Sequence, residues 1–264
     1  MILLGEGNTG KSVLRSLIIK ILGEENCHSI DIEQLNSDFG ASQINNKRMA
    51  GAGDMKVVKL GDIDIIKQLT GSDTVNANRK HLTAISFQYK GLLWFNSNKL
   101  PKFEGDRGKH VYERFIIVPC LHTVPENERN SNLVEELYEE RDAIISVSIQ
   151  ALKRSISNGY RFTECNLISE YRNRYELINN SLEHFISEYC IIGQGNIIRS
   201  KFNRIYIAWC KDNGYHIEPK SDIGKYLETN YNILPRKTGG GHMHYDLSID
   251  FEKLGQVGEY DLYY

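Results

Sequence analysis

The 264-residue sequence lacks the usual features of secreted and membrane proteins. Its five cysteines are scattered and form no C-x-x-C pair, which favours reduced thiols over a disulfide framework. No apolar run approaches the length of a membrane-spanning helix, and no signal peptide is recognisable. We therefore expect a cytoplasmic protein that does not contact a membrane.

The sequence also has little net charge and no repetition. The formal net charge is −2, so any binding to nucleic acid must come from local basic patches rather than from bulk charge. No internal repeat or low-complexity tract is present. With 41% hydrophobic and 25% charged residues, the composition is that of an ordinary soluble globular protein with one or two domains.

One stretch near the start of the chain fits a phosphate-binding motif at every fixed position. Gly5-Glu6-Gly7-Asn8-Thr9-Gly10-Lys11-Ser12 has the pattern G-x-x-x-x-G-K-[ST]. It follows the short apolar run 1–4 and precedes an apolar stripe at helical spacing that ends at Gly23. Strand, glycine-rich loop and helix form the context that a phosphate cradle requires.

The residue types in this loop indicate its chemistry. Glycines let backbone N–H groups turn toward an anion, and the helix N-terminus adds partial positive charge. Lys11 would reach the β- and γ-phosphates of a nucleotide, and the Ser12 hydroxyl would bind Mg²⁺. The residues predicted to bind the nucleotide are Gly5, Gly7, Asn8, Thr9, Gly10, Lys11 and Ser12.

Hydrolysis of a nucleotide also needs an acid for the magnesium and the attacking water, and Asp54 is the first candidate. We interpret residues 47–55 as a strand that ends at this acid. Because the Ala-Gly-Ala-Gly sequence in that strand is poor strand sequence, a solvated surface role for Asp54 stays equally open. Three other acids are rivals: Asp62, Asp64 and Asp73.

Two further polar residues adjoin apolar runs. Asn98 follows the buried-strand pattern of residues 91–95, and an amide beside the phosphate loop can hold an attacking water. The alternative for Asn98 is a turn-forming role before a proline. Arg114 opens the apolar segment 114–119, where an arginine could reach a neighbouring subunit's nucleotide; the alternative is a surface charge.

A basic stretch precedes a predicted hairpin. Residues 83–95 are expected to form two strands with a corner at 88–90, and Arg79, Lys80 and His81 lie just before them. Basic side chains on a hairpin could track a phosphate backbone. From composition alone, a solvated face is the stronger interpretation.

The chain is predicted to have three parts. Residues 1–125 alternate strands and helices, which indicates an α/β sheet covered on both faces, and residues 126–180 form a helical connector in which 133–157 is one long helix. Residues 181–264 carry three helices, the third capped by Ser221, and a glycine-tipped hairpin, which together are typical of a winged helix.

The winged-helix module is predicted to be basic although the chain is not. Residues 196–245 contain the basic residues Arg199, Lys201, Arg204, Lys211, Lys220, Lys225, Arg236 and Lys237, against the acids Asp212, Glu218, Asp222 and Glu228. Lys225, Arg236 and Lys237 are the candidates for contact with DNA. The alternative for this module is a protein–protein platform, because winged helices are often reused in that way.

The order of these motifs resembles that of superfamily 3 helicases, most closely the helicase part of phage and plasmid primase–helicases related to poxvirus primase-helicases. Residues 5–12 look like the family's phosphate loop, and Lys67-Gln68-Leu69-Thr70-Gly71-Ser72-Asp73 is similar to its K-x-L-T-G-G-D signature, with Ser72 for the second glycine. Asn98-Lys99-Leu100-Pro101 matches its N-x-x-P motif. Residues 112–120 resemble its W-R-R-x-x-x-I-P-F ending, with Glu113 for the first arginine and Cys120 for the phenylalanine.

This resemblance implies a P-loop AAA+-type three-layer αβα domain that assembles into a ring, usually a hexamer, and moves along single-stranded DNA. It implies that Lys11 and Ser12 hold ATP and Mg²⁺, that Asp54 polarises water and that Asn98 senses the γ-phosphate. Arg114, aligned with the second arginine, would complete a neighbour's site. Arg79, Lys80 and His81 look like the tip of the DNA-tracking hairpin in papillomavirus replicative helicases, which favours DNA contact over a solvated face.

Two functional hypotheses follow. The first is an ATP-dependent DNA helicase of phage or plasmid replication in a bacterial host, with single-stranded and duplex DNA, further copies of itself and a primase as partners. The second is a catalytically incomplete DNA-binding fragment or remnant, because only four residues precede the phosphate loop. A P-loop kinase for a small molecule is a third and weaker option, since it would not need a basic winged-helix module.

Overall fold

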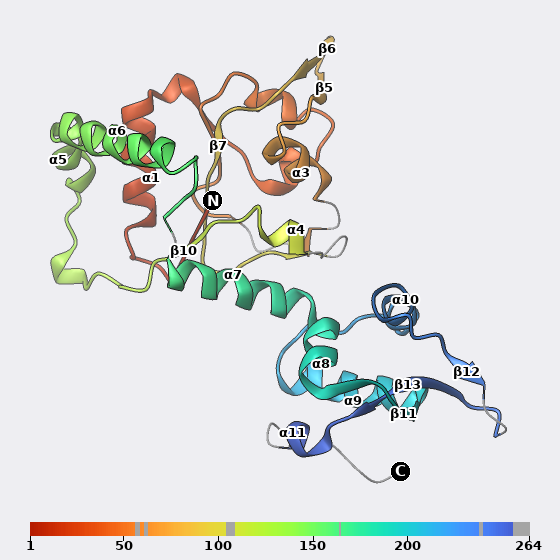
Figure 1. Ribbon diagram of the computed structural model, residues 1–264. Helices are drawn as coiled ribbons and strands as arrows, with labels where there is room; N and C mark the ends of the chain where they lie inside the picture. The colour runs from red at the N-terminus through yellow and green to blue at the C-terminus, as the bar shows by residue number, and fades with distance from the viewer. Residues whose placement is uncertain (56–58, 61–62, 104–108, 164, 238–239, 256–264) are drawn as a thin grey trace. The chain divides into compact units, whose positions relative to one another are not determined.

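The computed structural model describes residues 1–55, 59–60, 63–103, 109–163, 165–237 and 240–255, and Figure 1 traces its helices and strands. The chain divides into two compact units, Met1–Tyr175 and Glu176–Tyr264, each with its own apolar core. Every helix in the described ranges is too short or too polar to span a bilayer. The domain boundaries expected near residues 125 and 180 stay predictions.

The first unit is built on a parallel sheet. Its strands are β1 (Ile2–Leu4), β2 (Cys27–Ser29), β3 (Met49–Gly51), β7 (Leu92–Leu93), β8 (Phe95–Ser97) and β10 (Ile117–Pro119). β1 pairs with β8 and β10, and β3 pairs with β2 and β7, all in parallel. The N–H groups of Trp94 and Asn96 also donate to the carbonyls of Ala50 and Ala52, at 2.8 and 3.0 Å. The strands therefore form one continuous surface in the order β10–β1–β7/β8–β3–β2.

Helices cover both faces of this sheet. α1 (Lys11–Leu22) packs Ile18 and Ile19 against a cluster that contains Leu3 of β1. Ile2, which points to the opposite face, belongs to the main core. The helices that contribute to that core are α2 (Ile32–Leu35), α3 (Asp64–Thr70) and α4 (Lys109–Tyr112). A parallel sheet needs apolar cover on both sides, and the predicted mixed α/β class is confirmed.

The basic stretch lies at the tip of a hairpin that differs from the predicted one. β5 (Val75–Arg79) pairs antiparallel with β6 (Leu82–Phe87), and Lys80 and His81 form the turn between them. Figure 1 shows this hairpin projecting from the body of the first unit. The prediction of a hairpin over residues 83–95 is wrong, because β7 and β8 enter the parallel sheet instead.

Shorter elements complete the first unit. β4 (Lys59–Leu60) pairs in parallel with β9 (Lys102–Phe103). Single 3₁₀ turns occur at Glu24–Asn26, Ala41–Ile44 and Glu126–Glu128. The predicted stop of the first helix at Gly23 is confirmed, since this residue is the C-cap of α1 and has φ 86°.

The predicted single helix over residues 133–157 is wrong, because the chain forms two. α5 (Leu133–Glu139) ends at Glu140, whose φ of −87° and ψ of 9° break the helical path, and α6 (Arg141–Ser157) begins after it. α6 buries no residue, and its stripe of Ile145, Ile149, Leu152 and Ile156 is exposed. α7 (Asn166–Asn179) follows, and the hydroxyl of Tyr175 donates to the carbonyl of Pro101 at 2.6 Å.

The second unit combines helices with an antiparallel sheet. Its elements are α8 (Ser181–Tyr189), β11 (Cys190–Ile198), α9 (Arg199–Asp212), α10 (Lys220–Tyr231), β12 (Arg236–Lys237), β13 (Met243–Ile249) and α11 (Phe251–Gly255). The sheet has the order β11–β13–β12. Aromatic rings fill the core, where Trp209 lies 5.3 Å from Phe185 between centroids.

Two details of the second unit were not anticipated. β11 was not predicted, although its isoleucines at 191, 192, 197 and 198 pair with β13. Ser221 is not the N-cap of α10, since Pro219 holds that position and the Ser221 hydroxyl donates to Asp222 at 3.1 Å. The glycine tip predicted for the hairpin falls partly at residues 238–239, outside the described residues.

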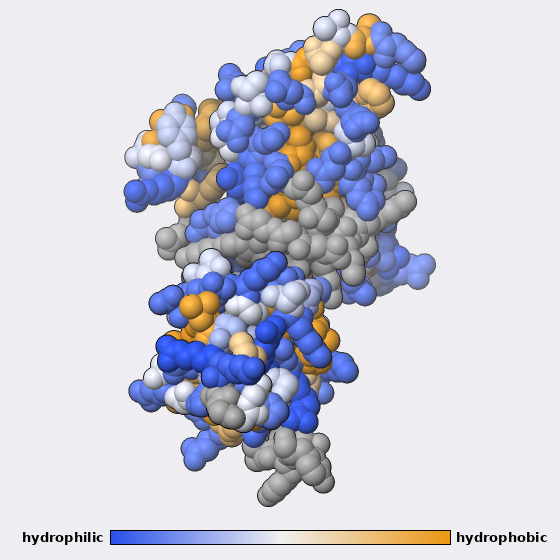
Figure 2. Space-filling view, turned by 90° about the vertical axis from the view of Figure 1, so that its right-hand side faces the viewer, coloured by the Kyte–Doolittle hydropathy of each residue, from blue (hydrophilic) through white to orange (hydrophobic). Residues whose placement is uncertain are grey.

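Figure 2 shows hydrophilic side chains over much of the visible face of both units, while apolar side chains in the first unit gather in a strip between them. In the second unit the exposed large apolar residues include Ile191, Leu234 and Met243. Scattered exposed apolar residues are normal for a folded domain and do not by themselves mark a site.

Candidate functional site

The loop between β1 and α1 needs glycine at two positions. A Cβ on Gly5 would lie 2.2 Å from the carbonyl oxygen of Cys120, so no side chain fits there. Gly10 has φ 81°, a left-handed conformation that favours glycine, and it forms the N-cap of α1. The fixed glycines of the motif are therefore explained by backbone geometry.

The loop presents the N-terminus of α1 without a side-chain cap. The first N–H groups of a helix have no partner within the helix, and the helix dipole places partial positive charge beside them. A helix start in this condition favours an anion, and phosphate groups are the usual occupants.

Lys11 is held inside the loop. Its side chain is only 8% exposed, and Nζ donates to the carbonyl of Gly5 at 2.7 Å, the carbonyl of Glu6 at 2.6 Å and the hydroxyl of Thr9 at 3.0 Å. Three oxygen acceptors stabilise the ammonium at this depth, because a buried charge without partners would be costly. The positive charge of Lys11 is thus fixed next to the helix N-terminus.

Segments distant in sequence join this loop in one pocket of about 360 Å³. The pocket is also lined by Gly53 and Asp54, which follow β3, and by Asn96, Ser97 and Asn98 at the end of β8, where the carbonyl of Ser97 accepts a hydrogen bond from the N–H of Gly5 at 3.0 Å. The sequence-predicted residues Lys11, Ser12, Asp54 and Asn98 therefore line one pocket.

Asp54 reaches the pocket from a bend rather than from a strand end. β3 ends at Gly51, so the prediction that Asp54 terminates this strand is wrong. Arg15 of α1 donates Nη2 to the carbonyl of Gly51 at 2.7 Å, which ties the start of the bend to the helix behind the loop. Asp54 itself is exposed. Of its rivals, Asp62 lies outside the described residues, and Asp64 and Asp73 do not line the pocket.

Asn98 stands in a turn fixed by its neighbour. The hydroxyl of Ser97 donates to the carbonyl of Lys99, and the N–H of Lys99 donates to Ser97 Oγ at 3.2 Å. Ser97 is buried, whereas Asn98 is exposed and its side chain is accessible to a ligand in the pocket. Asn98 therefore forms part of the turn and also lines the pocket.

Asn96 was missed from the sequence. It is 1% exposed, its Oδ1 accepts a hydrogen bond from Trp94 Nε1 at 2.9 Å, and its Nδ2 has no partner among the described residues. Leaving a buried donor unpaired costs about 1–3 kcal/mol, so such a group in a pocket wall calls for a ligand acceptor. The only sign of Asn96 in the sequence was a polar amide within the mainly apolar stretch 92–97.

The pocket also contains oxygen groups that suit a magnesium ion. Ser12 supplies an exposed hydroxyl and Asp54 an exposed carboxylate. No group of three or more histidine, cysteine, aspartate or glutamate side chains gathers as a metal site in the part of the chain that the structure describes. Magnesium bound with a nucleotide takes one or two protein ligands together with phosphate oxygens, so this donor set fits it.

Cys120 forms the apolar wall behind the loop. Burial raises the pKa of its thiol, while the positive charge of Lys11 opposes that shift. A thiol with a raised pKa is neutral near pH 7 and is a poor nucleophile. Cys120 therefore has a structural role, in which its backbone packs against Gly5, and does not act as a nucleophile.

Arg114 lies in a different place, against the end of α3. Its Nη1 donates to the carbonyl of Lys67 at 3.2 Å and to the hydroxyl of Thr70 at 3.1 Å, and it does not line the pocket. The predicted strand over 114–119 is shorter than expected, because β10 begins at Ile117. Two motifs distant in sequence, 67–73 and 112–114, thus meet in one cluster.

The remaining candidates are exposed but do not join the pocket. Arg79, Lys80 and His81 lie at the tip of the β5–β6 hairpin, where Arg79 Nε donates to the carbonyl of Thr83 at 2.9 Å. His81 has φ 60°, a left-handed conformation that is uncommon outside glycine. Lys225 on α10 and Arg236 and Lys237 on β12 belong to the second unit.

Comparison with known proteins gives distant similarities. Residues 3–114, a span that contains all the motif residues up to Arg114, match a family of unknown function, DUF5906. Two apo structures of the NrS-1 C-terminal region are 19% and 16% identical, with TM-scores of 0.42 and 0.44, each over 92% of this chain. JCV helicase, solved with a bound small molecule, is 16% identical with a TM-score of 0.35 over 83% of this chain.

The chain spans less than two thirds of the solved proteins that it matches, 65% and 64% of the two NrS-1 chains and 56% of JCV helicase. Identities below 20% and TM-scores below 0.5 do not establish a shared function. The geometry of the pocket is the stronger guide.

Proposed function

We propose that the chain is an ATP-hydrolysing DNA helicase of the superfamily 3 kind, acting in phage or plasmid replication. The observation that carries this proposal is the pocket of about 360 Å³, which gathers the glycine-rich loop, Asp54 and Asn98. These residues come from three segments of the chain and are the types that nucleotide hydrolysis needs.

Within this proposal each pocket residue has a task. The N–H groups of residues 7–12 and the Lys11 ammonium bind the phosphates, with Lys11 exchanging loop carbonyls for phosphate oxygens. Asp54 accepts a proton from, or orients, the attacking water, and Asn98 holds that water or the terminal phosphate. The buried Nδ2 of Asn96 donates to an oxygen in the same space.

Magnesium is the cofactor that this set would hold, through Ser12 and Asp54. When bound, it supplies positive charge that offsets the negative charge of the phosphates. The remaining stabilisation comes from the chain itself, since Lys11 and the helix N-terminus already carry fixed positive charge in the pocket.

Assembly is part of the proposal because the pocket lacks an arginine of its own among the described lining residues. Arg114, docked on α3 in the same subunit, would act on the nucleotide of a neighbour in a ring. A heterologous contact repeated around an axis closes into a ring, with a hexamer as the proposed form.

DNA contact is assigned to the hairpin tip and to the second unit. The exposed tip carries Arg79, Lys80 and His81 on a hairpin that projects from the first unit (Figure 1). The assignment of the second unit as a winged helix is supported by the order α8–β11–α9–α10–β12–β13 and by the sheet order β11–β13–β12. Basic side chains on both elements would contact phosphates without reading base sequence.

A second candidate function is a DNA-binding protein whose nucleotide pocket does not turn over. This second candidate is favoured by the hydrogen bonds of Lys11, whose ammonium already donates to three oxygens of its own loop. Because the loop is stable without a nucleotide, its stability does not require that the pocket hydrolyses ATP.

ATPase measurements with and without single-stranded DNA distinguish the two. The helicase proposal predicts turnover that DNA stimulates and that Lys11→Ala abolishes, with DNA binding retained in the variant. Lys20→Ala, which removes an amine on the same helix outside the pocket, serves as the control. Absence of turnover in the unchanged chain, with DNA binding intact, would instead support the second candidate.

A further inference from the structure

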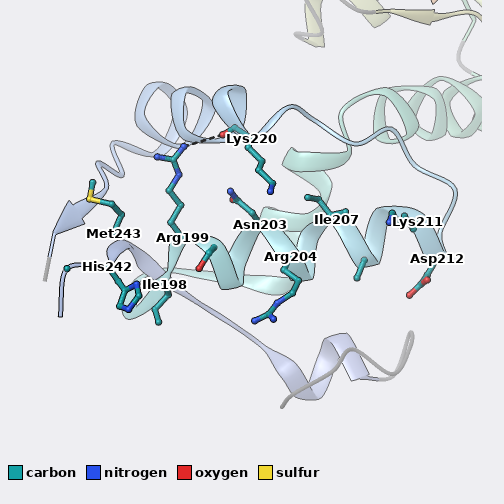
Figure 3. A pocket seen from close by; sticks show the side chains of 13 residues that line it. Ile198, Arg199, Asn203, Arg204, Ile207, Lys211, Asp212, Lys220, His242 and Met243 are labelled. Atoms are coloured by element: carbon teal, nitrogen blue, oxygen red, sulfur yellow. Dashed lines mark hydrogen bonds between the residues drawn. The ribbon is translucent and has the colours of Figure 1, made fainter. Parts of the chain in front are cut away.

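A groove of about 910 Å³ lies within the second unit, outside the sites predicted from the sequence. One long side is the solvent-facing surface of α9, and the other parts come from Lys220 at the start of α10 and from residues 241–243 at the start of β13. Figure 3 shows His242 and Met243 at one end of the groove and Lys211 and Asp212 at the other.

The groove is lined by basic side chains. They are Arg199, Arg204, Lys211 and Lys220, with Asp212 as the acid among the lining residues. Three of them follow α9 from residue 199 to residue 211, a rise of roughly 18 Å at the helical spacing of 1.5 Å per residue. Arg199 is turned toward α10, where its Nη2 donates to the carbonyl of Lys220 at 3.4 Å, whereas Arg204 and Lys211 lie close together around the helix. Cations spread over this length fit an extended polyanion rather than a single small anion.

Asn203 supplies an independent observation. It is 5% exposed, it lines the groove, and its Oδ1 has no hydrogen-bond partner among the described residues. In Figure 3 the side chain of Lys220 extends from α10 toward the side of α9 that carries Asn203. A buried acceptor without a partner is costly, so a ligand that fills the groove should bring a donor to this point.

The lining also contains apolar surface. Ile198, Ile207 and Met243 lie beside the cations. A flat ring or a sugar packs against such surface, whereas an inorganic anion gains nothing from it.

These three requirements select the ligand class. Inorganic phosphate would satisfy the cations but would leave Asn203 and the apolar side chains unused. An acidic peptide would supply charge but no ring at regular spacing. A nucleic-acid strand carries phosphates, rings and N–H or O–H donors together.

We propose that this groove binds a nucleic-acid strand, with its phosphates on Arg199, Arg204, Lys211 and Lys220 and a base or sugar donor on Asn203. The inference rests on the proposed DNA-binding role of the second unit and moves the main contact from α10 and β12 to α9. Lys237 pairs with the groove residue Met243 across the β12–β13 ladder and Arg236 pairs with His244, but neither Lys237 nor Arg236 lines the groove itself.

The test uses the full chain and a fluorescein-labelled single-stranded oligonucleotide, with binding followed by anisotropy. The double variant Arg204→Ala/Lys211→Ala removes two exposed cations of the groove. We expect at least about 10-fold weaker binding and a salt dependence whose slope falls by about 1.4, because two phosphate contacts are lost.

Two matched variants make this result specific. Lys153→Ala/Arg154→Ala removes the same charge from exposed positions of α6 in the first unit and should leave affinity unchanged. Lys225→Ala/Arg236→Ala removes it from the second unit outside the groove. Weakening by this last pair without weakening by the groove pair would overturn the inference and leave DNA binding by the second unit intact.

Asn203→Ala tests the floor of the groove. Removing an unpartnered buried acceptor should leave the thermal midpoint unchanged or raised, while oligonucleotide binding weakens several-fold. Equal affinity in the variant, or displacement of the oligonucleotide by polyglutamate at equal charge, would overturn the assignment to nucleic acid.

Failure of this inference can be told from failure of the proposed function. Basal ATPase activity, measured without DNA on the same groove variants, depends on the pocket at residues 5–12 and should be unaffected. Absence of ATPase activity in the unchanged chain, with groove-dependent oligonucleotide binding intact, would contradict the proposed function alone. Equal oligonucleotide affinity in the unchanged chain and in the groove variants, with DNA-stimulated ATPase activity intact, would overturn the groove alone.

Discussion

The pocket of the first unit and the groove of the second are built in opposite ways. The pocket uses backbone: a loop with two required glycines, an uncapped helix N-terminus and segments from three places in the chain. The groove uses side chains, most of them on one face of α9. The pocket fixes a few groups in place, whereas the groove presents long cationic side chains along a helix.

This difference explains why one site has a sequence motif and the other has none. Gly5 lies so close to the backbone of Cys120 that no side chain fits there, and Gly10 has φ 81°, a conformation that favours glycine. Both positions are therefore restricted to glycine. A cation that contacts phosphate can come from several positions on a helix, and lysine or arginine can provide it. Sites made of backbone therefore constrain sequence more strongly than sites made of surface side chains.

The largest expected effect comes from the glycine at the end of β3, two residues before the pocket residue Gly53. Gly51 has φ 141°, and a Cβ there would lie 1.9 Å from the carbonyl oxygen of Trp94. Gly51→Ala should destabilise the first unit by about 3 kcal/mol or more, since both the conformation and the space are unsuitable. Hydrogen exchange read by mass spectrometry would locate the loss in residues 1–175 and leave the second unit protected.

Gly7→Ala is the matched control for that experiment. Gly7 has no atom within 4 Å of its Cβ position and no positive φ, so its substitution should change stability little. Equal destabilisation by the two variants would contradict the view that close backbone approach restricts this region.

The next effect concerns the acid of the pocket. Asp54→Asn keeps the shape of the side chain and removes its charge, so ATP turnover should fall by about 100-fold while nucleotide binding is retained. Steady-state ATPase kinetics and nucleotide titration measure the two properties separately. Asp38→Asn, an exposed carboxylate outside the pocket, should be neutral, and a stronger effect of Asp64→Asn or Asp73→Asn would assign the role to one of those rivals.

Arg114 tests whether the pocket is completed by a neighbour. Arg114→Ala removes two hydrogen bonds to the end of α3, which should cost about 1–2 kcal/mol of stability, and it should also reduce turnover. If the arginine acts on a neighbouring subunit, mixing inactive Arg114→Ala with inactive Lys11→Ala chains should restore up to about a quarter of the activity in mixed rings.

No recovery of activity in the mixture would contradict action between subunits. Arg114→Lys is the conservative control, because it keeps one donor for the carbonyl of Lys67 but loses the planar fork of the guanidinium. Full activity with lysine would indicate that the residue only stabilises the end of α3.

The smallest effect lies in the aromatic core of the second unit. Burial lowers the pKa of His184, which packs 5.3 Å from Trp209 between ring centroids, although Glu188 opposes the shift. Because the folded state holds fewer protons than the unfolded state, stability should fall as the pH drops below about 6.5, the ordinary pKa of histidine. The loss should be below about 1 kcal/mol, since the ring is half exposed and solvent screens the charge.

Urea unfolding at pH 7.5 and 5.5 measures this dependence, and His184→Phe should flatten it. Glu188, whose pKa the hydrogen bond from Lys253 lowers, contributes in a more acidic window, near the ordinary pKa of a carboxylate. A pH dependence between 7.5 and 5.5 that persists in the His184→Phe variant would exclude His184 as its cause.

Much of the first unit could be predicted from the sequence because its signals are local. The apolar run 1–4, the glycine-rich loop and the stripe ending at Gly23 predicted β1, the turn and α1 in order. The hairpin was misplaced because residues 83–95 contain two apolar runs of strand character, and nothing local indicates that β7 and β8 pair with β3 and β1 instead. Strand partners depend on long-range contacts that hydrophobic pattern does not specify.

In the second unit the helices α8, α9 and α10 were predicted, whereas β11 and α11 were not. The apolar spacing of α8, α9 and α10 was visible, but glycines at 193 and 195 obscured the strand pattern of β11. The basic residues of α9 were counted as part of a basic module, and their convergence with Lys220 and residues 241–243 could not be predicted without the fold.

The sequence by itself determined the glycine-rich loop at residues 5–12, because the conformations and charge that this loop needs are set by eight consecutive residues. Only the tertiary structure placed Asp54 and Asn98 in one pocket with that loop, joined Arg114 to residues 67–73 and showed Asn96 and Asn203 buried with unpaired polar atoms. The physical reason is the distance along the chain between the residues that interact. Conformation and helix spacing are encoded by neighbours in sequence, whereas pockets and unpaired groups arise only when distant segments pack together.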